Sequence, residues 1–156
     1  MTQRDASLFV ILGAIGLDAA SKEAALMFLE GRIVPVLPFF NLTLGFNRGV
    51  SFGMFSAEGA AGWWALILAT LAISLLVGWF WHRARTLPDR LGYAAILGGA
   101  LGNLVDRLPD GAVTDFIDLH AGGWHFPTFN VADIAISAGV LLLLLSSTLS
   151  SRMQRA

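Results

Sequence analysis

Four long apolar runs constrain this chain of 156 residues more than any other feature. A helix needs about 20 apolar residues to cross the hydrocarbon core of a bilayer. The sequence predicts spans at about residues 7–28, 60–81, 91–108 and 131–149. Charged residues make up only 13% of the chain, against about 25% in typical soluble domains. We therefore expect an all-α membrane protein, a four transmembrane helix bundle that forms a single domain.

Positive charges predict the orientation of this bundle. Lys and Arg concentrate in the cytoplasmic loops of membrane proteins. Arginines flank the N-terminus, the 82–90 loop and the C-terminus, so both termini and this loop are expected in the cytoplasm. The longer loops, about 29–59 and 109–130, then face outward.

Part of the first outer loop has the pattern of short strands. Apolar and small or polar residues alternate through Leu42–Phe46, and a largely apolar piece, Ile33–Pro38, precedes it. We expect a small extracytoplasmic β-cradle on the membrane surface, with an ordinary ordered loop as the alternative. In the second outer loop, Asp118, His120 and His125 are interpreted as loop residues.

The first apolar run also has the form of a cleavable signal peptide. Arg4 precedes an apolar stretch that ends at Asp18-Ala19-Ala20. Three more spans follow, and the run continues past Lys22, so we interpret it as a span. An intact N-terminus on the mature protein would decide between the two.

Charge and cysteine content exclude several classes of function. The net charge is −1 and no basic face is evident, so no nucleic-acid partner is expected. The absence of cysteine excludes disulfides, thiolate metal sites and a cysteine nucleophile.

Two ionisable residues lie within the first predicted span. Asp18 and Lys22 are spaced i and i+4, so they share one face of the helix and can pair. Charged residues at membrane depth are costly and mark function by default. A neutralised clamp between helices is the structural interpretation of this pair, and direct chemistry is the other.

Two further acids stand on opposite sides of the second outer loop. Asp115 lies in the apolar segment Val113–Ile117, and Asp133 lies three residues into the fourth span. Singly, each has a simple explanation, as a solvated loop acid and a helix-start carboxylate. Together, both are embedded in apolar residues at a similar depth, which favours a shared site.

A carboxylate pair supports a specific chemistry. Two carboxylates about 3 Å apart cannot both ionise, so one keeps a proton. The ionised partner takes a proton from water, and the protonated one donates to a substrate carbonyl. We expect peptide hydrolysis by Asp115 and Asp133 without a metal or other cofactor.

Three alternatives remain at this point. The first is a divalent metal site, although no histidine pair has a ligand spacing such as HExxH. Its ligands would be Asp115, Asp118, His120, His125 and Asp133. The second is a small proton-coupled transporter or channel that uses intramembrane carboxylates, which would spread through the depth of the bundle rather than gather at one end. The third is a non-enzymatic scaffold, which leaves the two embedded acids unexplained.

Five polar or glycine-rich strings carry a family resemblance. They are Asp18–Lys22, Phe46–Gly53, Gly98–Arg107, Val113–Ile117 and Phe129–Asp133. In order and spacing they resemble the lipoprotein signal peptidase family, the bacterial signal peptidase II enzymes, over nearly the whole chain. The resemblance implies an aspartyl peptidase of the bacterial inner membrane with its active site at the periplasmic face. Such an enzyme cuts diacylglyceryl-modified prolipoproteins on the amino side of the lipidated cysteine, contacts membrane lipid and is inhibited by globomycin.

The resemblance also assigns residues. Its catalytic pair matches Asp115 and Asp133, the acids already selected. Its other functional positions match Asp18, Lys22, Asn47, Gly49, Asn103, Asp106, Arg107, Asn130 and Ala132. Two departures, Ala19 and Ser51, leave the pair untouched and concern only local substrate contacts.

Physical roles follow for the remaining positions. Asn103 and Asn130 are expected to orient the carboxylates or the scissile peptide, or to cap helix ends. Asp106 and Arg107 are expected to pair with each other.

The glycines and the first outer loop have roles of a different kind. Gly98 and Gly102 form a GxxxG pair for close helix packing. Asn47 and Arg48 are expected to contact the bound peptide or lipid head group, with a plain exposed loop arginine as the alternative. The 29–59 loop would then close over the site.

Overall fold

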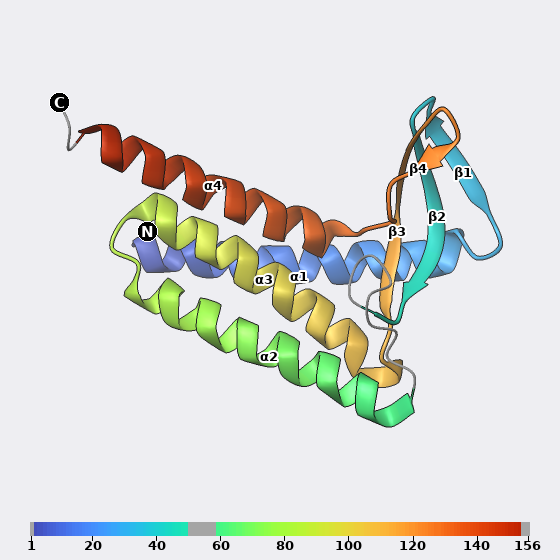
Figure 1. The fold of residues 1–156 in the computed structure, drawn as a ribbon, viewed down its shortest axis with the longest axis horizontal. Coiled ribbons are helices and arrows are strands. Elements are labelled where there is room, and N and C mark those ends of the chain that lie inside the picture. Colours follow the sequence, from blue (N-terminus) through green and yellow to red (C-terminus); the bar gives the residue numbers. More distant parts are fainter. Residues whose placement is uncertain (1, 50–58, 154–156) are drawn as a thin grey trace.

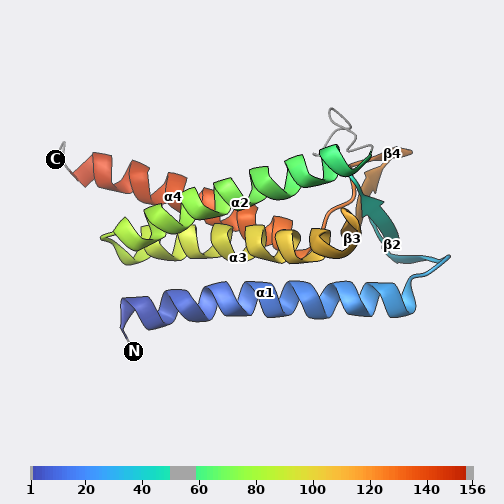
Figure 2. The same ribbon diagram turned by 90° about the horizontal axis from the view of Figure 1, so that it is seen from below.

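The computed structural model describes residues 2–49 and 59–153. Helices α1, α2, α3 and α4 run along one another, and a small sheet stands at one end of them (Figures 1 and 2). The helices are α1 (Gln3–Phe28), α2 (Gly59–Arg83), α3 (Leu87–Asp110) and α4 (Val131–Met153). The start of α1 and the end of α4 lie at the end of the bundle away from the sheet.

Each helix contains one of the predicted spans and extends beyond it. Capping groups explain some of the boundaries. Thr2 and Asp5 form a reciprocal capping box at the start of α1, and Gly111, with φ of 78°, ends α3 in the left-handed conformation. Within the described residues, two helices are long and apolar enough to cross a membrane by themselves. These are the segments Ala61–Arg83 and Val131–Leu149, with mean hydropathies of 2.0 and 1.9.

Helix α3 lies at the centre of the bundle and packs on the other three helices. Glycines permit the closest approaches. A Cβ atom on Gly98 would lie 2.8 Å from the Cβ of Ala14 on α1, and one on Gly99 would lie 2.4 Å from the carbonyl oxygen of Ala132 on α4. Gly102 faces Asp18 of α1 in the same way. The close packing predicted from Gly98 and Gly102 is therefore confirmed.

The sheet is antiparallel, with strand order β1-β2-β3-β4. Its strands are β1 (Ile33–Leu37), β2 (Phe40–Asn47), β3 (Val113–Ala121) and β4 (Trp124–His125). The strands expected in the first outer loop are confirmed. The prediction that Asp118, His120 and His125 are loop residues is wrong, because Asp118 and His120 lie in β3 and His125 lies in β4. The start of β3 is buried on both faces, so it lacks the alternation that marks a half-buried strand.

The register of β2 and β3 fixes the position of Asp115. Gly45 of β2 stands opposite Asp115, and Asn47 stands opposite Val113. At the end of α1, Phe116 of β3 packs with Ala25 and Leu29 in a small apolar core. The sheet is therefore anchored on the end of α1, and Asp115 is held beside the start of α4.

Candidate active site

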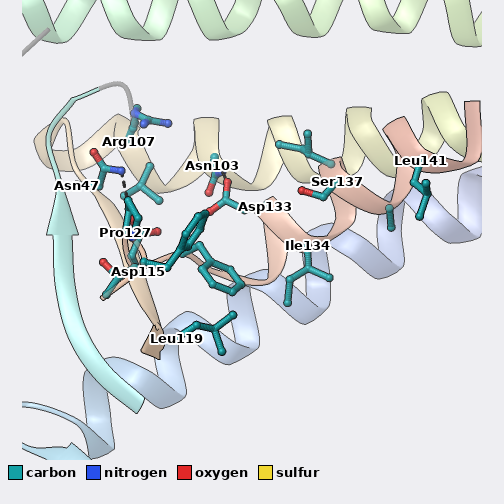
Figure 3. A pocket seen from close by; sticks show the side chains of 16 residues that line it. Asn47, Asn103, Arg107, Asp115, Leu119, Pro127, Asp133, Ile134, Ser137 and Leu141 are labelled. Carbon is teal, nitrogen blue, oxygen red and sulfur yellow. Dashed lines mark hydrogen bonds between the residues drawn. The ribbon is translucent and has the colours of Figure 1, made fainter. Parts of the chain in front are cut away.

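A pocket of about 680 Å³ opens where β3 meets the start of α4 (Figure 3). Its polar lining is formed by Asn47, Asn103, Arg107, Asp115, Thr128, Asp133 and Ser137. The remaining wall is largely apolar and extends along α4, which means that one ligand can meet acids at one end and hydrocarbon at the other. The large apolar members of this wall are Leu119, Phe126, Pro127, Phe129, Ile134, Ile136 and Leu141.

Asp115 is a buried carboxylate held by two amides. Its side chain accepts hydrogen bonds from Asn47 Nδ2 at 3.2 Å and from Asn130 Nδ2 at 2.7 Å. Only 3% of Asp115 is exposed. Burial raises the pKa of Asp115 to about 6, the negative charge of Asp133 adds to the rise, and the hydrogen bond from Asn47 opposes it. This carboxyl therefore holds a proton more readily than an ordinary aspartate.

Asp133 is a helix-start carboxylate and a pocket residue at once. The backbone N–H of Asn130 donates to Asp133 Oδ2 at 3.2 Å, and the backbone N–H of Asp133 donates to Asn130 Oδ1 at 3.1 Å. This reciprocal pair caps α4. The other oxygen, Oδ1, accepts a hydrogen bond from Asn103 Nδ2 at 2.9 Å. Asp133 is therefore both a helix-start carboxylate and a member of a shared site with Asp115, the two interpretations made from the sequence.

Asn130 joins the two acids. Its side-chain amide donates to Asp115 and accepts from the backbone of Asp133, and it is completely buried. Asp115 comes from a strand and Asp133 from a helix, yet both line one pocket and interact electrostatically. The structure therefore brings together the two acids that the sequence selected.

A second polar cluster lies behind the pocket, between α1 and α3. Lys22 Nζ lies 2.7 Å from Asp18 Oδ2, which confirms the predicted pair, and 3.2 Å from Asp106 Oδ2. Asp18 Oδ1 accepts a hydrogen bond from the backbone N–H of Ala132 at 2.9 Å. This cluster therefore connects α1 to α3 and to the first turn of α4.

The predicted pair between Asp106 and Arg107 is wrong. Successive residues on a helix point about 100° apart, so the two side chains face different neighbours. Asp106 turns to Lys22 and accepts the backbone N–H of Thr114 at 2.7 Å. Arg107 lines the pocket and donates to the carbonyl oxygen of Gly49 at 3.3 Å. Arg107 thus links the pocket to the first outer loop.

Positions 47–49 lie within the first outer loop, at and just after the end of β2, beside the pocket. Gly49 donates its N–H to Asn47 Oδ1 at 3.1 Å. Arg48 is largely exposed, and its Nη2 atom lies 3.9 Å from Asp110 Oδ2. Arg48 therefore stands apart from the two acids. Ser51 and the rest of the Phe46–Gly53 string after Gly49 lie outside the described residues, as does the 50–58 part of the loop expected to close over the site.

The five residues considered for a metal site are divided between two places. Asp115 and Asp133 line the pocket. Asp118 and His125 bind each other at 2.8 Å on the β3–β4 end of the sheet, where the ring of His120 stacks on that of His125. Burial acts to raise the pKa of Asp118, but hydrogen bonds from His125 and Asn41 outweigh it and hold this pKa below its ordinary value. In the part of the chain that the structure describes, no three acidic, histidine or cysteine side chains form a metal-binding group.

The apolar wall was not predicted from the sequence, and neither were Thr128 and Ser137, which line the pocket, nor Thr114, which contacts its polar residues. Ile134 directly follows Asp133, and Leu141 lies seven residues further along α4, so helical periodicity was a signal for an apolar stripe beside the acid. Thr114 binds Asp106 through its N–H and accepts Asn130 through its carbonyl oxygen. These are backbone contacts, for which the side chain gives no signal.

The fold has a close relative among solved structures. One chain, described as "Bacterial membrane enzyme structure by the in meso method at 2.3 A resolution", matches with a TM-score of 0.80 and 27% identity, over 94% of this chain and 90% of that one. A second, at 1.9 Å, matches with a TM-score of 0.79. The long helices, the apolar spans and the polar pocket thus define a helical membrane enzyme.

Sequence comparisons identify which kind. Residues 10–149 match the family model described as signal peptidase (SPase) II. A lipoprotein signal peptidase of Photorhabdus laumondii is 41% identical over 92% of this chain and 87% of its own length. One of Burkholderia pseudomallei is 46% identical over 88% and 82%. The chain belongs to the signal peptidase II family and is a peptidase.

Proposed function

We propose that this peptidase removes the signal peptide from diacylglyceryl-modified prolipoproteins and that Asp115 and Asp133 are its catalytic pair. The observation that carries the proposal is the convergence of both carboxylates on one pocket, joined by the buried amide of Asn130. The relatives named lipoprotein signal peptidase support the substrate class. The cut falls on the amino side of the lipidated cysteine.

The pair hydrolyses a peptide bond by acid–base catalysis. The ionised carboxylate takes a proton from a water as its oxygen attacks the scissile carbonyl carbon, and the protonated carboxyl donates to the carbonyl oxygen. The resulting gem-diol collapses, the C–N bond breaks, and the leaving amine takes a proton from the pair. One water is consumed, no covalent intermediate forms, and the dyad returns to its starting state.

The geometry of the bundle supports a position in the inner membrane. α2 and α4 have the length and hydropathy of spans. We include α1 and α3 as the other two spans, because large apolar side chains such as Leu12, Leu17 and Val105 are more than half exposed along them. Positive charges favour cytoplasmic termini. The sheet and the first turn of α4, which carry Asp115 and Asp133, lie at the opposite end of the bundle, and we propose that this end faces the periplasm.

The apolar wall of the pocket suits a lipidated substrate. A signal peptide is an apolar helix, and the diacylglyceryl group adds two hydrocarbon chains next to the cut. Ile134, Ile136 and Leu141 provide apolar surface along α4, beginning beside Asp133. Membrane lipid and globomycin-type cyclic peptides are expected to compete for the same surface.

Cleavage of a synthetic precursor peptide tests this function directly. The purified enzyme in detergent micelles should cut a peptide that carries diacylglyceryl cysteine, and globomycin should inhibit the reaction. The same peptide with an unmodified cysteine is the control and should remain intact. Proton-coupled flux in liposomes without cleavage would instead favour the transporter, which the gathering of acids at one end of the bundle disfavours.

The pH dependence of the reaction follows from Asp115. The pair needs one proton, and the pKa of Asp115 is about 6, so kcat/KM should fall as the pH rises above this value. The hydrogen bond from Asn47 lowers this pKa, so Asn47→Ala should raise it and move the basic limb to higher pH. Asn41→Ala is the matched control, because Asn41 lies on the same strand but binds Asp118. A basic limb that stays in place in Asn47→Ala would contradict the assignment to Asp115.

A further inference from the structure

Lys22 is a buried ammonium group whose three protons are all in use. Its Nζ atom lies 2.7 Å from Asp18 Oδ2, 3.2 Å from Asp106 Oδ2 and 2.9 Å from Asn103 Oδ1. The residue is only 4% exposed. An ammonium has three donors and no acceptor. Lys22 therefore has no spare proton to give to a substrate, and it acts on the reaction through its hydrogen-bond partners and through its charge.

Asn103 is the partner that leads to the catalytic pair. A side-chain amide has an oxygen that accepts and a nitrogen that donates, and it can sit either way round. Because Lys22 only donates, the oxygen of Asn103 must face it. The amide nitrogen is thereby directed to the other side, where it donates to Asp133 Oδ1 at 2.9 Å. The ammonium fixes the direction of this hydrogen bond.

The same oxygen reaches Asp115 indirectly. Asn103 Oδ1 also accepts a hydrogen bond from Asn130 Nδ2 at 3.2 Å, and that nitrogen donates to Asp115 Oδ1 at 2.7 Å. With Lys22 and Asn130 bound, both lone pairs of the Asn103 oxygen are occupied. One cation in the α1–α3 interface is thus connected to both carboxylates through two amides.

We infer that Lys22 is a positioning residue for the reaction, which fixes the orientation of the Asn103 amide so that an N–H always points at Asp133. This inference rests on the proposed function of the aspartate pair. A donor on Asp133 Oδ1, together with the Asn130 N–H on Oδ2, holds this carboxylate in one orientation at the pocket. Burial raises the pKa of Asp115, so Asp115 is the acid that holds the shared proton, and Asp133 is left as the base that takes the proton from water.

Other charges near these groups are consistent with this division. Asp18 on α1 and Asp106 on α3 face Lys22 directly, and Glu23 lines the cavity beside it. Arg107 on α3 faces both acids of the pair. The positive charge of Lys22 also lowers the pKa of Asp115. Removing that charge should therefore raise the pKa of Asp115 further.

A double-mutant cycle on kcat tests the inference. Lys22→Met and Asn103→Leu, made singly and together, remove the cation, the amide and both. Each single change should lower kcat roughly 10²-fold, the size expected when a reacting group loses its alignment, with KM within about twofold of the parent. Because both act through one hydrogen bond, the double variant should have nearly the kcat of Asn103→Leu. Glu23→Gln changes the charge at the neighbouring position and should keep the parental kcat.

The outcomes separate this inference from the proposed function. Two results would overturn the positioning role and leave the aspartate pair intact. The first is a double variant whose loss of kcat is the product of the two single losses. The second is a full kcat in Lys22→Met when Asp133→Asn is inactive. Full cleavage by both Asp115→Asn and Asp133→Asn would overturn the two together. If Lys22→Met does not fold, Lys22→Gln is the test variant. Its amide keeps N–H donors for Asp18 and Asp106, but its oxygen can accept a hydrogen bond, so the Asn103 amide is free to take either orientation. This variant should show the same loss of kcat and a basic limb at higher pH.

Discussion

Asp115→Asn and Asp133→Asn should each reduce kcat for cleavage of a diacylated precursor by roughly 10⁴-fold, the upper range for a lost acid–base group. An amide has the shape of a carboxyl group but neither takes a proton from water nor passes one to the leaving amine. The loss should therefore appear in kcat, while precursor binding persists. Single-turnover cleavage in micelles and binding of a fluorescent globomycin analogue would measure the two separately.

These two variants should still fold. Ionised Asp115 is disfavoured in the native protein because its pKa is raised to about 6, which costs about 3 kcal/mol near neutral pH. The neutral amide of Asp115→Asn removes that cost, and this gain offsets the loss of a hydrogen bond to the carboxylate. Asp118→Asn is the matched control, because Asp118 lies three residues further along β3 and binds Asn41 and His125 instead. Normal cleavage by either dyad variant, or loss of cleavage in Asp118→Asn, would refute the pair.

Gly99→Val should destabilise the protein by about 3 kcal/mol and remove most of the activity with it. Even one methyl group on Gly99 would lie 2.4 Å from the carbonyl oxygen of Ala132 and 2.8 Å from the side chain of Ile136. Backbone atoms cannot yield as a flexible side chain can, so α3 and α4 must separate. Asp133 lies next to Ala132, and its hydrogen bond from Asn103 crosses this interface. Thermal unfolding in micelles, followed by tryptophan fluorescence, gives the measurement.

Gly13→Val is the control for this prediction. Gly13 lies within α1, as Gly99 lies within α3, but a Cβ atom there meets nothing within 4 Å. The same substitution should leave both the unfolding temperature and the cleavage rate close to those of the parent. Equal behaviour of the two variants would mean that the α3–α4 contact does not set the position of Asp133.

The helices were predictable because each one is indicated by a continuous segment of the sequence. A run of apolar residues defines a span wherever it lies in the chain, and the small residues at 98 and 102 mark a close approach by their spacing alone. The strand Val113–Ala121 was not predictable in this way. It pairs with Phe40–Asn47, about 70 residues earlier, and burial on both faces removes the alternation that would reveal it. Non-local pairing leaves little trace in a short window.

The site divides along the same line. Asp115 and Asp133 were selected because acids embedded in apolar sequence are unusual, and the pairing of Asp18 with Lys22 followed from helical spacing. The partners of Asp106 and Arg107 were not predictable, because they depend on which helix lies opposite. Asp106 meets Lys22 across the α1–α3 interface, and Arg107 meets the carbonyl oxygen of Gly49. Sequence spacing indicates which residues share one face of a helix, but the tertiary fold determines which element packs against that face.

The hydrogen bond between Asp18 and Ala132 has a consequence for how the enzyme is made. It joins α1 to the first turn of α4, and Asp133 follows one residue later. A chain in which only α1, α2 and α3 have been inserted has neither Asp133 nor the cap that orients it. Assembly of the proposed site therefore waits until the start of α4 has docked against α1.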